Sequence, residues 1–177
     1  LDSDEICSFW SKVEGCGLHM ITALALKMIL VTGQRPGEIA GMNGSEISGR
    51  IWTIPASRRG KTETSHSIYL TDTALEIIEA ARRELARLEG RRKALSGEIV
   101  FAAVPGKAIT NSALARAVER SHVVLGAKVV EPWGRWTPHD LRRTAISIML
   151  EAGVDGDIRR RITGHQAHDL HGRAYDR

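Results

Sequence analysis

The sequence contains few cysteines and few aromatic residues. Two cysteines, Cys7 and Cys16, occur in 177 residues, together with two phenylalanines and two tyrosines. Without a CxxC motif or a Cys/His array there is no basis for a disulfide scaffold or a structural zinc site, so a cytoplasmic location is expected. The longest apolar run, 21–31, contains Lys27 and is well short of the roughly 20 residues that cross a bilayer. This run therefore predicts a core helix.

Composition describes one globular domain. The chain has 25 Lys+Arg against 21 Asp+Glu and is 42% hydrophobic, which excludes intrinsic disorder. Its 17 glycines and 5 prolines follow no period, which excludes a collagen-like chain. A net charge of +4 is mild and does not by itself indicate nucleic-acid binding. The sequence starts at Leu1, with neither an initiator methionine nor the layout of a signal peptide. An excised domain or processed fragment is therefore expected.

Hydrophobic spacing and capping residues predict a mainly α fold with a small antiparallel β-sheet, an α+β architecture. Helices are predicted over 19–32, 36–42, 110–125, 138–153 and 157–163, and a further helix is predicted to open at 71–73 and to run to 88. Thr73 and Glu76 have the spacing of a capping box, and Thr137-Pro138 is a strong helix start. Two short β-like runs, 50–55 and 65–70, predict a hairpin whose loop carries Lys61.

Two positions in the first turn of the helix at 138 suit phosphate chemistry. His139 and Arg142 are three residues apart and share a face. Free backbone N–H groups and the positive end of the helix dipole favour a bound phosphate there, and the dipole also helps to keep His139 neutral. Stabilising a phosphate transition state without a metal calls for two forked guanidinium groups, for which Arg35 and Arg142 are candidates. The alternative is a solvated His and Arg at a surface helix start.

Five segments resemble, in their order, the catalytic domain of the tyrosine recombinases, or phage integrases. The segments are TGQRPGEIAGM at 32–42, RRGKTETSHSIYL at 58–70, TPHDLRRTA at 137–145, TGH at 163–165 and AYDR at 174–177. Each is weak alone, but their combination is specific and covers nearly the whole chain. The resemblance implies that residues 1–177 form the catalytic domain and that an N-terminal DNA-clamping domain is absent from this chain.

The resemblance also implies a reaction and a catalytic set. In it, Tyr175 attacks a DNA phosphodiester, which yields a 3′-phosphotyrosyl link and a free 5′-hydroxyl. Because a phenol ionises near pH 10, this attack needs a base and nearby cations. The implied residues are Arg35, Lys61, His139, Arg142, His165 and Tyr175, with Glu38 in a supporting position.

The roles of these residues follow the family position by position. Arg35 and Arg142 clamp the phosphate, and His139 is the base-like partner of the nucleophile. His165 donates a hydrogen bond to a phosphate oxygen. Lys61 protonates the leaving 5′-oxygen, although two neighbouring arginines, Arg58 and Arg59, compete for that assignment.

No cofactor or metal is implied, and the partner is double-stranded DNA. The full-length protein is expected to act as a homotetramer on paired DNA sites, in integration or excision of a mobile element, whereas this fragment is expected to be a monomer. Three histidines lie near the C-terminus, at 165, 168 and 171. They are interpreted as a source of adventitious metal affinity and not as a designed metal site. Gly60-Lys61-Thr62 resembles the end of a P-loop, but Pro55 stands where the first glycine should be.

Three alternatives stay open. A type IB topoisomerase-like enzyme would use the same chemistry without joining two duplexes. A DNA-binding module without catalysis would retain the fold, and a helical protein unrelated to DNA would show no salt-sensitive DNA binding. The four tryptophans are interpreted as core or surface packing residues and not as base-stacking platforms.

Overall fold

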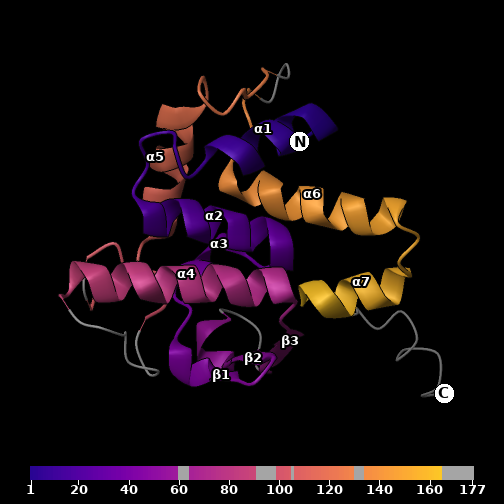
Figure 1. Cartoon of the computed structure of the whole chain (residues 1–177). Coiled ribbons are helices and arrows are strands. Elements are labelled where there is room, and N and C mark those ends of the chain that lie inside the picture. Colours follow the sequence, from indigo (N-terminus) through magenta and orange to yellow (C-terminus); the bar gives the residue numbers. More distant parts are fainter. Residues whose placement is uncertain (60–63, 91–98, 105, 130–133, 165–177) are drawn as a thin grey trace.

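The computed structural model of the chain describes residues 1–59, 64–90, 99–104, 106–129 and 134–164. In chain order its elements are α1 (Ser3–Lys12), α2 (Met20–Thr32), α3 (Pro36–Ala40), η1 (Gly44–Glu46), β1 (Ile47–Ser48), β2 (Ile51–Ile54), η2 (Ala56–Arg58), β3 (His66–Tyr69), α4 (Asp72–Leu88), α5 (Asn111–Ser121), α6 (Pro138–Glu151) and α7 (Gly156–Thr163). The predicted mainly α fold with a small antiparallel sheet is confirmed (Figure 1).

Helix α2 lies at the centre of the helical layer because it is apolar around most of its circumference. Helices α4 and α6 pack against it, and α7 turns back along α6 (Figure 1). Gly33 ends α2 in the left-handed conformation, with φ 64°, which a residue without Cβ adopts at little cost. The chain therefore turns directly into Arg35 and the short helix α3.

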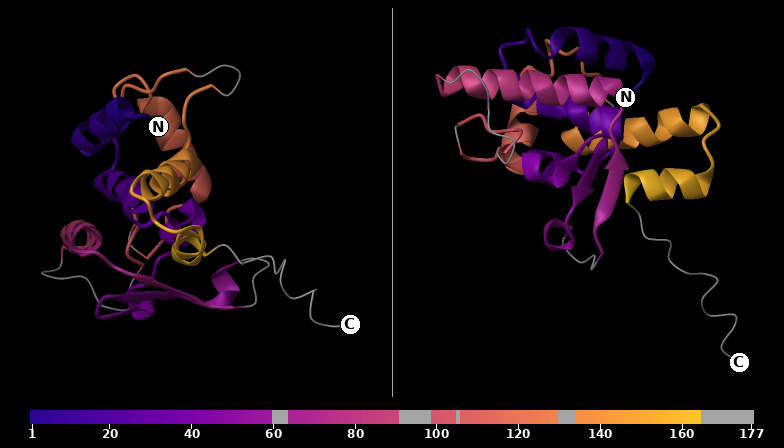
Figure 2. Two further views of the ribbon diagram at one scale, coloured as in Figure 1. Left: turned by 90° about the vertical axis from the view of Figure 1, so that its right-hand side faces the viewer. Right: turned by 60° about the horizontal axis from the view of Figure 1, so that its bottom comes forward.

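Below the helices lies a three-stranded antiparallel sheet with the order β1-β2-β3 (Figure 2). Trp52 pairs with Ile68, and both side chains are buried in the core together with Ile54. The predicted hairpin thus corresponds to β2 and β3. Strand β1 was not predicted, because two residues are too short to show an alternating pattern.

Most helix ends lie close to the predicted positions. The prediction that Thr73 caps α4 is wrong: Thr71 is the N-cap and accepts a hydrogen bond from the backbone N–H of Ala74 at 3.3 Å. Helix α1 was not predicted, although its capping box of Asp2 and Glu5 is a usable sequence signal.

Several smaller predictions also have outcomes in the structure. Trp52 and Trp136 are buried packing residues, as predicted, whereas Trp10 is partly exposed and Trp133 lies outside the described residues. Cys7 and Cys16 are free thiols. Within the described ranges, no helix is long and apolar enough to cross a membrane.

Candidate active site

Arg35 is placed by the tight turn between α2 and α3. It is the N-cap of α3, and Pro36 occupies the first helical position. Glu38 accepts two hydrogen bonds from Arg35, each at 3.0 Å. One carboxylate oxygen accepts from the backbone N–H of Arg35 and the other accepts from its guanidinium. The Glu38 side chain is 4% exposed and that of Arg35 is 40% exposed. Arg35 is therefore oriented from behind while its guanidinium stays accessible.

Arg142, from α6, is buried at 2% exposure. Its two terminal nitrogens donate hydrogen bonds to the carbonyl oxygens of Gly33 at 2.7 Å and Thr163 at 2.8 Å. These contacts rule out the interpretation of Arg142 as a solvated surface residue. Burial lowers the pKa of Arg142 to about 10, and repulsion by Arg35 adds to this effect. The structure thus brings the two predicted phosphate-binding arginines into one electrostatic cluster.

His139 is the second residue of the same helix, and its pKa is lowered from 6.5. The direction agrees with the prediction, but the cause differs: burial contributes most, followed by the positive charges of Arg143 and Arg142. At neutral pH the imidazole is therefore uncharged and can accept a proton.

Two further residues belong to this cluster: Arg59, which the sequence offered only as a competitor of Lys61, and His66, which the sequence did not single out. The Arg59 side chain is 3% exposed and its Nε lies 3.7 Å from a Glu38 oxygen. His66, the first residue of β3, donates from Nε2 to the carbonyl of Ile162 at 3.1 Å. Burial lowers the pKa of His66, and the charge of Arg59 lowers it further. No sequence signal separates Arg59 from its neighbour Arg58, and a single histidine in a strand has no diagnostic spacing.

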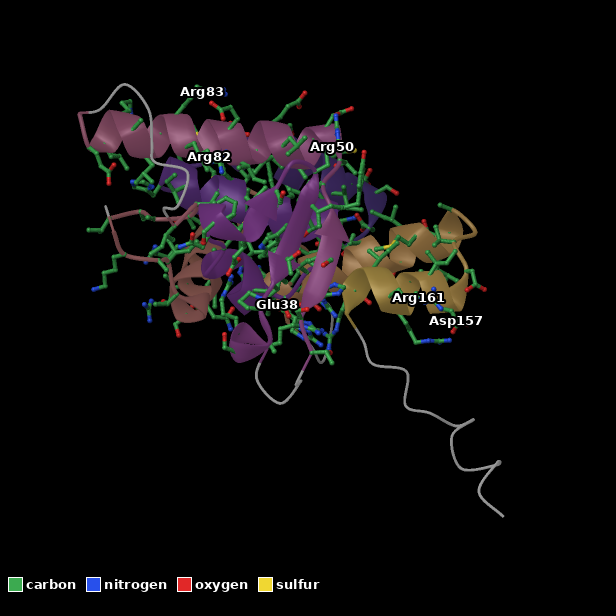
Figure 3. The ribbon with its side chains drawn as sticks, turned by 90° about the horizontal axis from the view of Figure 1, so that it is seen from below. Glu38, Arg50, Arg82, Arg83, Asp157 and Arg161 are labelled. Carbon is green, nitrogen blue, oxygen red and sulfur yellow. The ribbon has the colours of Figure 1, made fainter. Side chains whose placement is uncertain are left out.

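Cationic and polar side chains from other parts of the chain lie around the C-terminal end of α7. Its last carbonyls accept hydrogen bonds from four side chains of other elements: Gln34 and His66 on Ile162, Arg142 on Thr163, and Arg59 on Gly164. Carbonyls at a helix C-terminus carry partial negative charge, which stabilises nearby cations. Figure 3 shows the resulting concentration of side-chain nitrogens around Glu38.

Close packing at this end requires Gly164. Its φ is 65°, and a Cβ there would lie 2.7 Å from an Arg59 nitrogen. Thr163 is buried, and its hydroxyl donates a hydrogen bond to the Arg159 carbonyl at 2.8 Å. This hydrogen bond lies within α7 and satisfies the buried hydroxyl.

The structure therefore unites four of the predicted residues: Arg35, Glu38, His139 and Arg142. Lys61, His165 and Tyr175 lie outside the described residues, as does the histidine group at 165–171. Elsewhere in the described part of the chain, no group of three metal-ligating side chains occurs.

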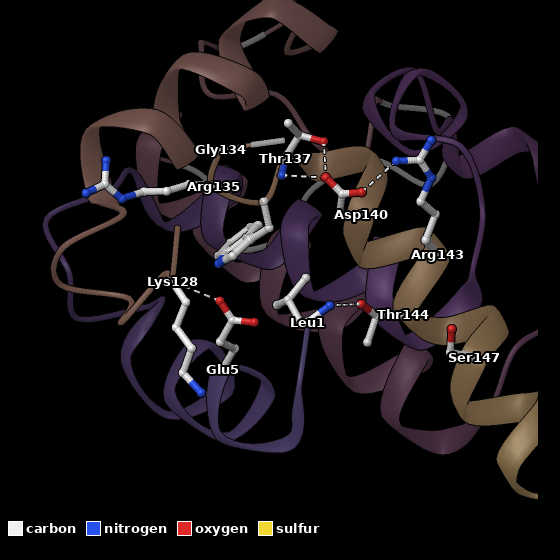
Figure 4. Close-up of a pocket in the computed structure, with 11 residues that line it drawn as sticks. Leu1, Glu5, Lys128, Gly134, Arg135, Thr137, Asp140, Arg143, Thr144 and Ser147 are labelled. Atoms are coloured by element: carbon white, nitrogen blue, oxygen red, sulfur yellow. Dashed lines mark hydrogen bonds and ion pairs between the residues drawn. The ribbon is translucent and has the colours of Figure 1, made fainter. Parts of the chain in front are cut away.

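A pocket of about 640 Å³ lies beside the first turns of α6, on a face that includes the chain start (Figure 4). Its two acidic groups are already engaged: Asp140 accepts hydrogen bonds from Thr137 and from Arg143, and Glu5 accepts one from the Lys128 backbone. Because none of the clustered residues around Glu38 lines this pocket, it is separate from the candidate active site.

This architecture is that of the catalytic cores of site-specific recombinases. The lambda integrase catalytic core matches with a TM-score of 0.73 and 19% identity, covering 96% of this chain and 93% of that one. XerH site-specific recombinase bound to difH matches with a TM-score of 0.70 and 19% identity over 94% of this chain. The Tn1549 transposon integrase in complex with transposon right end DNA matches with a TM-score of 0.67, 19% identity and 94% coverage of this chain.

The profile of the phage integrase family matches residues 1–176, and the chain belongs to this family. It spans 47% of the XerH chain and 57% of the Tn1549 integrase chain. A comparison with curated protein sequences found no match.

Proposed function

We propose that residues 1–177 are the catalytic domain of a site-specific recombinase that cleaves and rejoins double-stranded DNA through a 3′-phosphotyrosyl intermediate. The observation that carries this proposal is the placement of Arg35 and Arg142 around the buried carboxylate of Glu38. A phosphodiester brought beside Arg35 would supply the negative charge that this cationic cluster favours, through charge-assisted and bidentate hydrogen bonds.

In the proposed reaction, the phenolic oxygen of Tyr175 attacks the phosphorus and the bond to the 5′-oxygen breaks. His139, neutral because its pKa is lowered, accepts the phenolic proton, and Lys61 gives a proton to the leaving oxygen. His165 donates to a phosphate oxygen. Religation reverses these steps without an external energy source, since the phosphotyrosyl ester retains the phosphodiester's energy.

The assignment of Lys61 over its two neighbours is supported by the contacts of those neighbours. Arg58 donates to the carboxylate of Glu46 and to the backbone carbonyl of Glu38. Arg59 donates to two carbonyl oxygens and is buried. Because both arginine side chains already bond to groups of the protein, Lys61 is favoured as the residue that reaches DNA.

The proposal extends to the whole protein. Solved relatives include a lambda integrase dimer bound to a core site and a lambda integrase tetramer bound to a Holliday junction. We propose that the full-length protein adds an N-terminal DNA-clamping domain and assembles as a homotetramer on paired sites to integrate or excise a mobile element. The chain alone is proposed to be a cytoplasmic monomer that needs no metal or cofactor.

Supercoiled plasmid provides a direct test, because it needs no knowledge of the target sequence. The chain is incubated with plasmid in EDTA, quenched with denaturant and assayed for DNA-linked protein and relaxed topoisomers. Tyr175→Phe should abolish the adduct. Tyr69→Phe is a matched control, because Tyr69 is the other of the two tyrosines of the chain and lies exposed on β3.

The outcomes separate the alternatives. An adduct that Tyr175→Phe removes and Tyr69→Phe leaves intact supports the proposal, and clustering of the adducts at a defined sequence favours a recombinase over a topoisomerase-like enzyme. If neither this chain nor one extended by an N-terminal clamping domain forms an adduct, yet both bind DNA, a DNA-binding module replaces the proposal.

A further inference from the structure

Arg58 connects the sheet side of the molecule to the short helix that follows Arg35. It is the last residue of η2, and its side chain is 23% exposed. One terminal nitrogen donates to both carboxylate oxygens of Glu46 at 2.5 Å, and the other donates to the backbone carbonyl of Glu38 at 2.5 Å. A single guanidinium therefore joins η1, η2 and α3.

Glu46 is itself held from the buried side. Its carboxylate accepts a hydrogen bond from the indole N–H of Trp52 at 2.9 Å, and its side chain is 10% exposed. Trp52 is a fully buried residue of β2 and pairs with Ile68 in the sheet. The contacts thus run in one line from the core, through Trp52, Glu46 and Arg58, to the backbone of α3.

This line of contacts ends at the residue that orients Arg35. The carboxylate of Glu38 accepts from the backbone and from the guanidinium of Arg35, while the Glu38 carbonyl accepts from Arg58. Glu38 is thereby fixed at its side chain and at its backbone. Helix α3 has five residues and few backbone hydrogen bonds of its own, so its orientation depends on contacts of this kind.

We infer that Arg58 is a positioning residue, which ties α3 to the sheet and so keeps the guanidinium of Arg35 where it meets a DNA phosphate. This inference rests on the proposed function, in which Arg35 binds the phosphodiester. Arg58 acts through Glu38 and not by contact with DNA, because its terminal nitrogens donate to Glu46 and to α3. Such a tie matters for rate, because a misplacement of about 1 Å can cost roughly 10²-fold.

The space for this contact is provided by Gly41, which follows α3. A Cβ at position 41 would lie 2.9 Å from a terminal nitrogen of Arg58. The φ of Gly41 is −94°, so an alanine there does not need the left-handed conformation. Gly41→Ala should therefore displace the Arg58 side chain from the Glu38 carbonyl while both residues remain in the chain. Gly15→Ala is a matched control, since a Cβ there meets the Lys12 carbonyl at 3.9 Å, an ordinary contact.

A second substitution, Arg58→Gln, removes the guanidinium itself. Its matched control is Arg50→Gln, because Arg50 also donates to a carboxylate, that of Asp72 at 2.6 Å. The Arg50 side chain is 46% exposed and lies apart from Glu38 (Figure 3). The two arginine variants therefore remove the same charge, but only one of them releases α3.

The experiment measures single-turnover cleavage by the 177-residue chain, at saturating protein and at the sites mapped from wild-type adducts. Two oligonucleotide substrates are compared, one with the natural phosphodiester and one with a methylphosphonate at the cleaved bond. The methylphosphonate carries no negative charge, so a guanidinium stabilises it less. A misplaced Arg35 therefore slows cleavage of the charged substrate more than of the neutral one, whereas a general loss of structure slows both equally.

We expect Arg58→Gln and Gly41→Ala to slow cleavage of the natural substrate by roughly 10- to 100-fold, and to slow cleavage of the methylphosphonate much less. Arg50→Gln and Gly15→Ala should match wild type on both substrates. An unchanged rate for either Arg58→Gln or Gly41→Ala, or equal losses on the two substrates, would overturn the inference.

Amide hydrogen exchange separates this inference from the proposed function. If the wild-type chain forms no adduct, the proposed reaction fails, but the hold of Arg58 on α3 is still measurable. Arg58→Gln should speed exchange of the Arg35 amide, which bonds to a carboxylate, and of the Gly41 amide, which bonds to the Gly37 carbonyl, relative to Arg50→Gln. Unchanged exchange at both amides refutes the role of Arg58 in holding α3.

Discussion

Glu38→Gln tests whether a buried carboxylate holds the arginine cluster together. Glutamine keeps the shape of the side chain but removes the charge that Arg35 and Arg59 approach at 3.0 Å and 3.7 Å. Removing one partner of a buried ion pair costs about 3–5 kcal/mol. The share due to Arg35 is reduced by solvent, because its side chain is 40% exposed. We therefore expect the free energy of unfolding to fall by about 3 kcal/mol, chiefly through the buried Arg59.

At this chain length, each kcal/mol shifts the melting temperature by roughly 2–4 °C, so the expected decrease is about 6–12 °C. Calorimetry and urea unfolding measure it. Glu79→Gln is the control, because Glu79 and Arg83 form an exposed pair whose loss should cost about 1 kcal/mol or less.

A double-mutant cycle with Arg59→Gln should return a coupling of about 1–3 kcal/mol, because each substitution alone leaves the other charge buried. If Glu38→Gln is as stable as Glu79→Gln, or if the coupling is zero, the assignment of Glu38 as the counter-ion of this cluster is wrong.

Three further predictions concern titration, backbone geometry and DNA binding. Burial lowers the pKa of His66 and of His139 below 6.5, so below that pH the unfolded chain binds more protons than the folded chain. The free energy of unfolding should therefore be highest above pH 6.5 with respect to these two groups. It should decline as the pH falls from 6.5 toward their pKa values in the folded chain. Urea unfolding across this window should show a weaker decline for His66→Gln and for His139→Gln, and an unaltered profile in both would contradict the assignment. Gly164→Ala and Gly153→Ala both place alanine at a positive φ, but the Cβ at 164 meets Arg59 at 2.7 Å whereas the one at 153 meets nothing within 4 Å. Strain alone should cost each about 1–2 kcal/mol, so thermal unfolding should show a larger loss for Gly164→Ala, and equal losses would refute the close approach. DNA affinity, measured by fluorescence anisotropy, should fall linearly with salt on a double-logarithmic plot, and a salt-independent affinity would argue against phosphate contacts.

Local chain chemistry explains which parts of the fold were predictable. Thr137 and Pro138 start α6, Gly33 ends α2 and Gly164 ends α7, because caps and left-handed turns depend on a few neighbouring residues. Thr73 was mistaken for a cap because Thr71, two residues earlier, is equally suitable by type. The resemblance of the motifs to one family implied the fold and the order of the proposed catalytic residues.

The sequence by itself determined the family, the helices α2 to α7, and the placement of Glu38 three residues after Arg35 at a helix start, whereas the ion pair between these two side chains is seen only in the structure. Only the tertiary structure decided which arginine of the 58–59 pair is buried, and that His66 and Arg59 meet the last carbonyls of α7. These contacts join residues about a hundred positions apart. Burial and long-range hydrogen bonds depend on how helices and strands pack, and short-range sequence spacing carries no record of that packing.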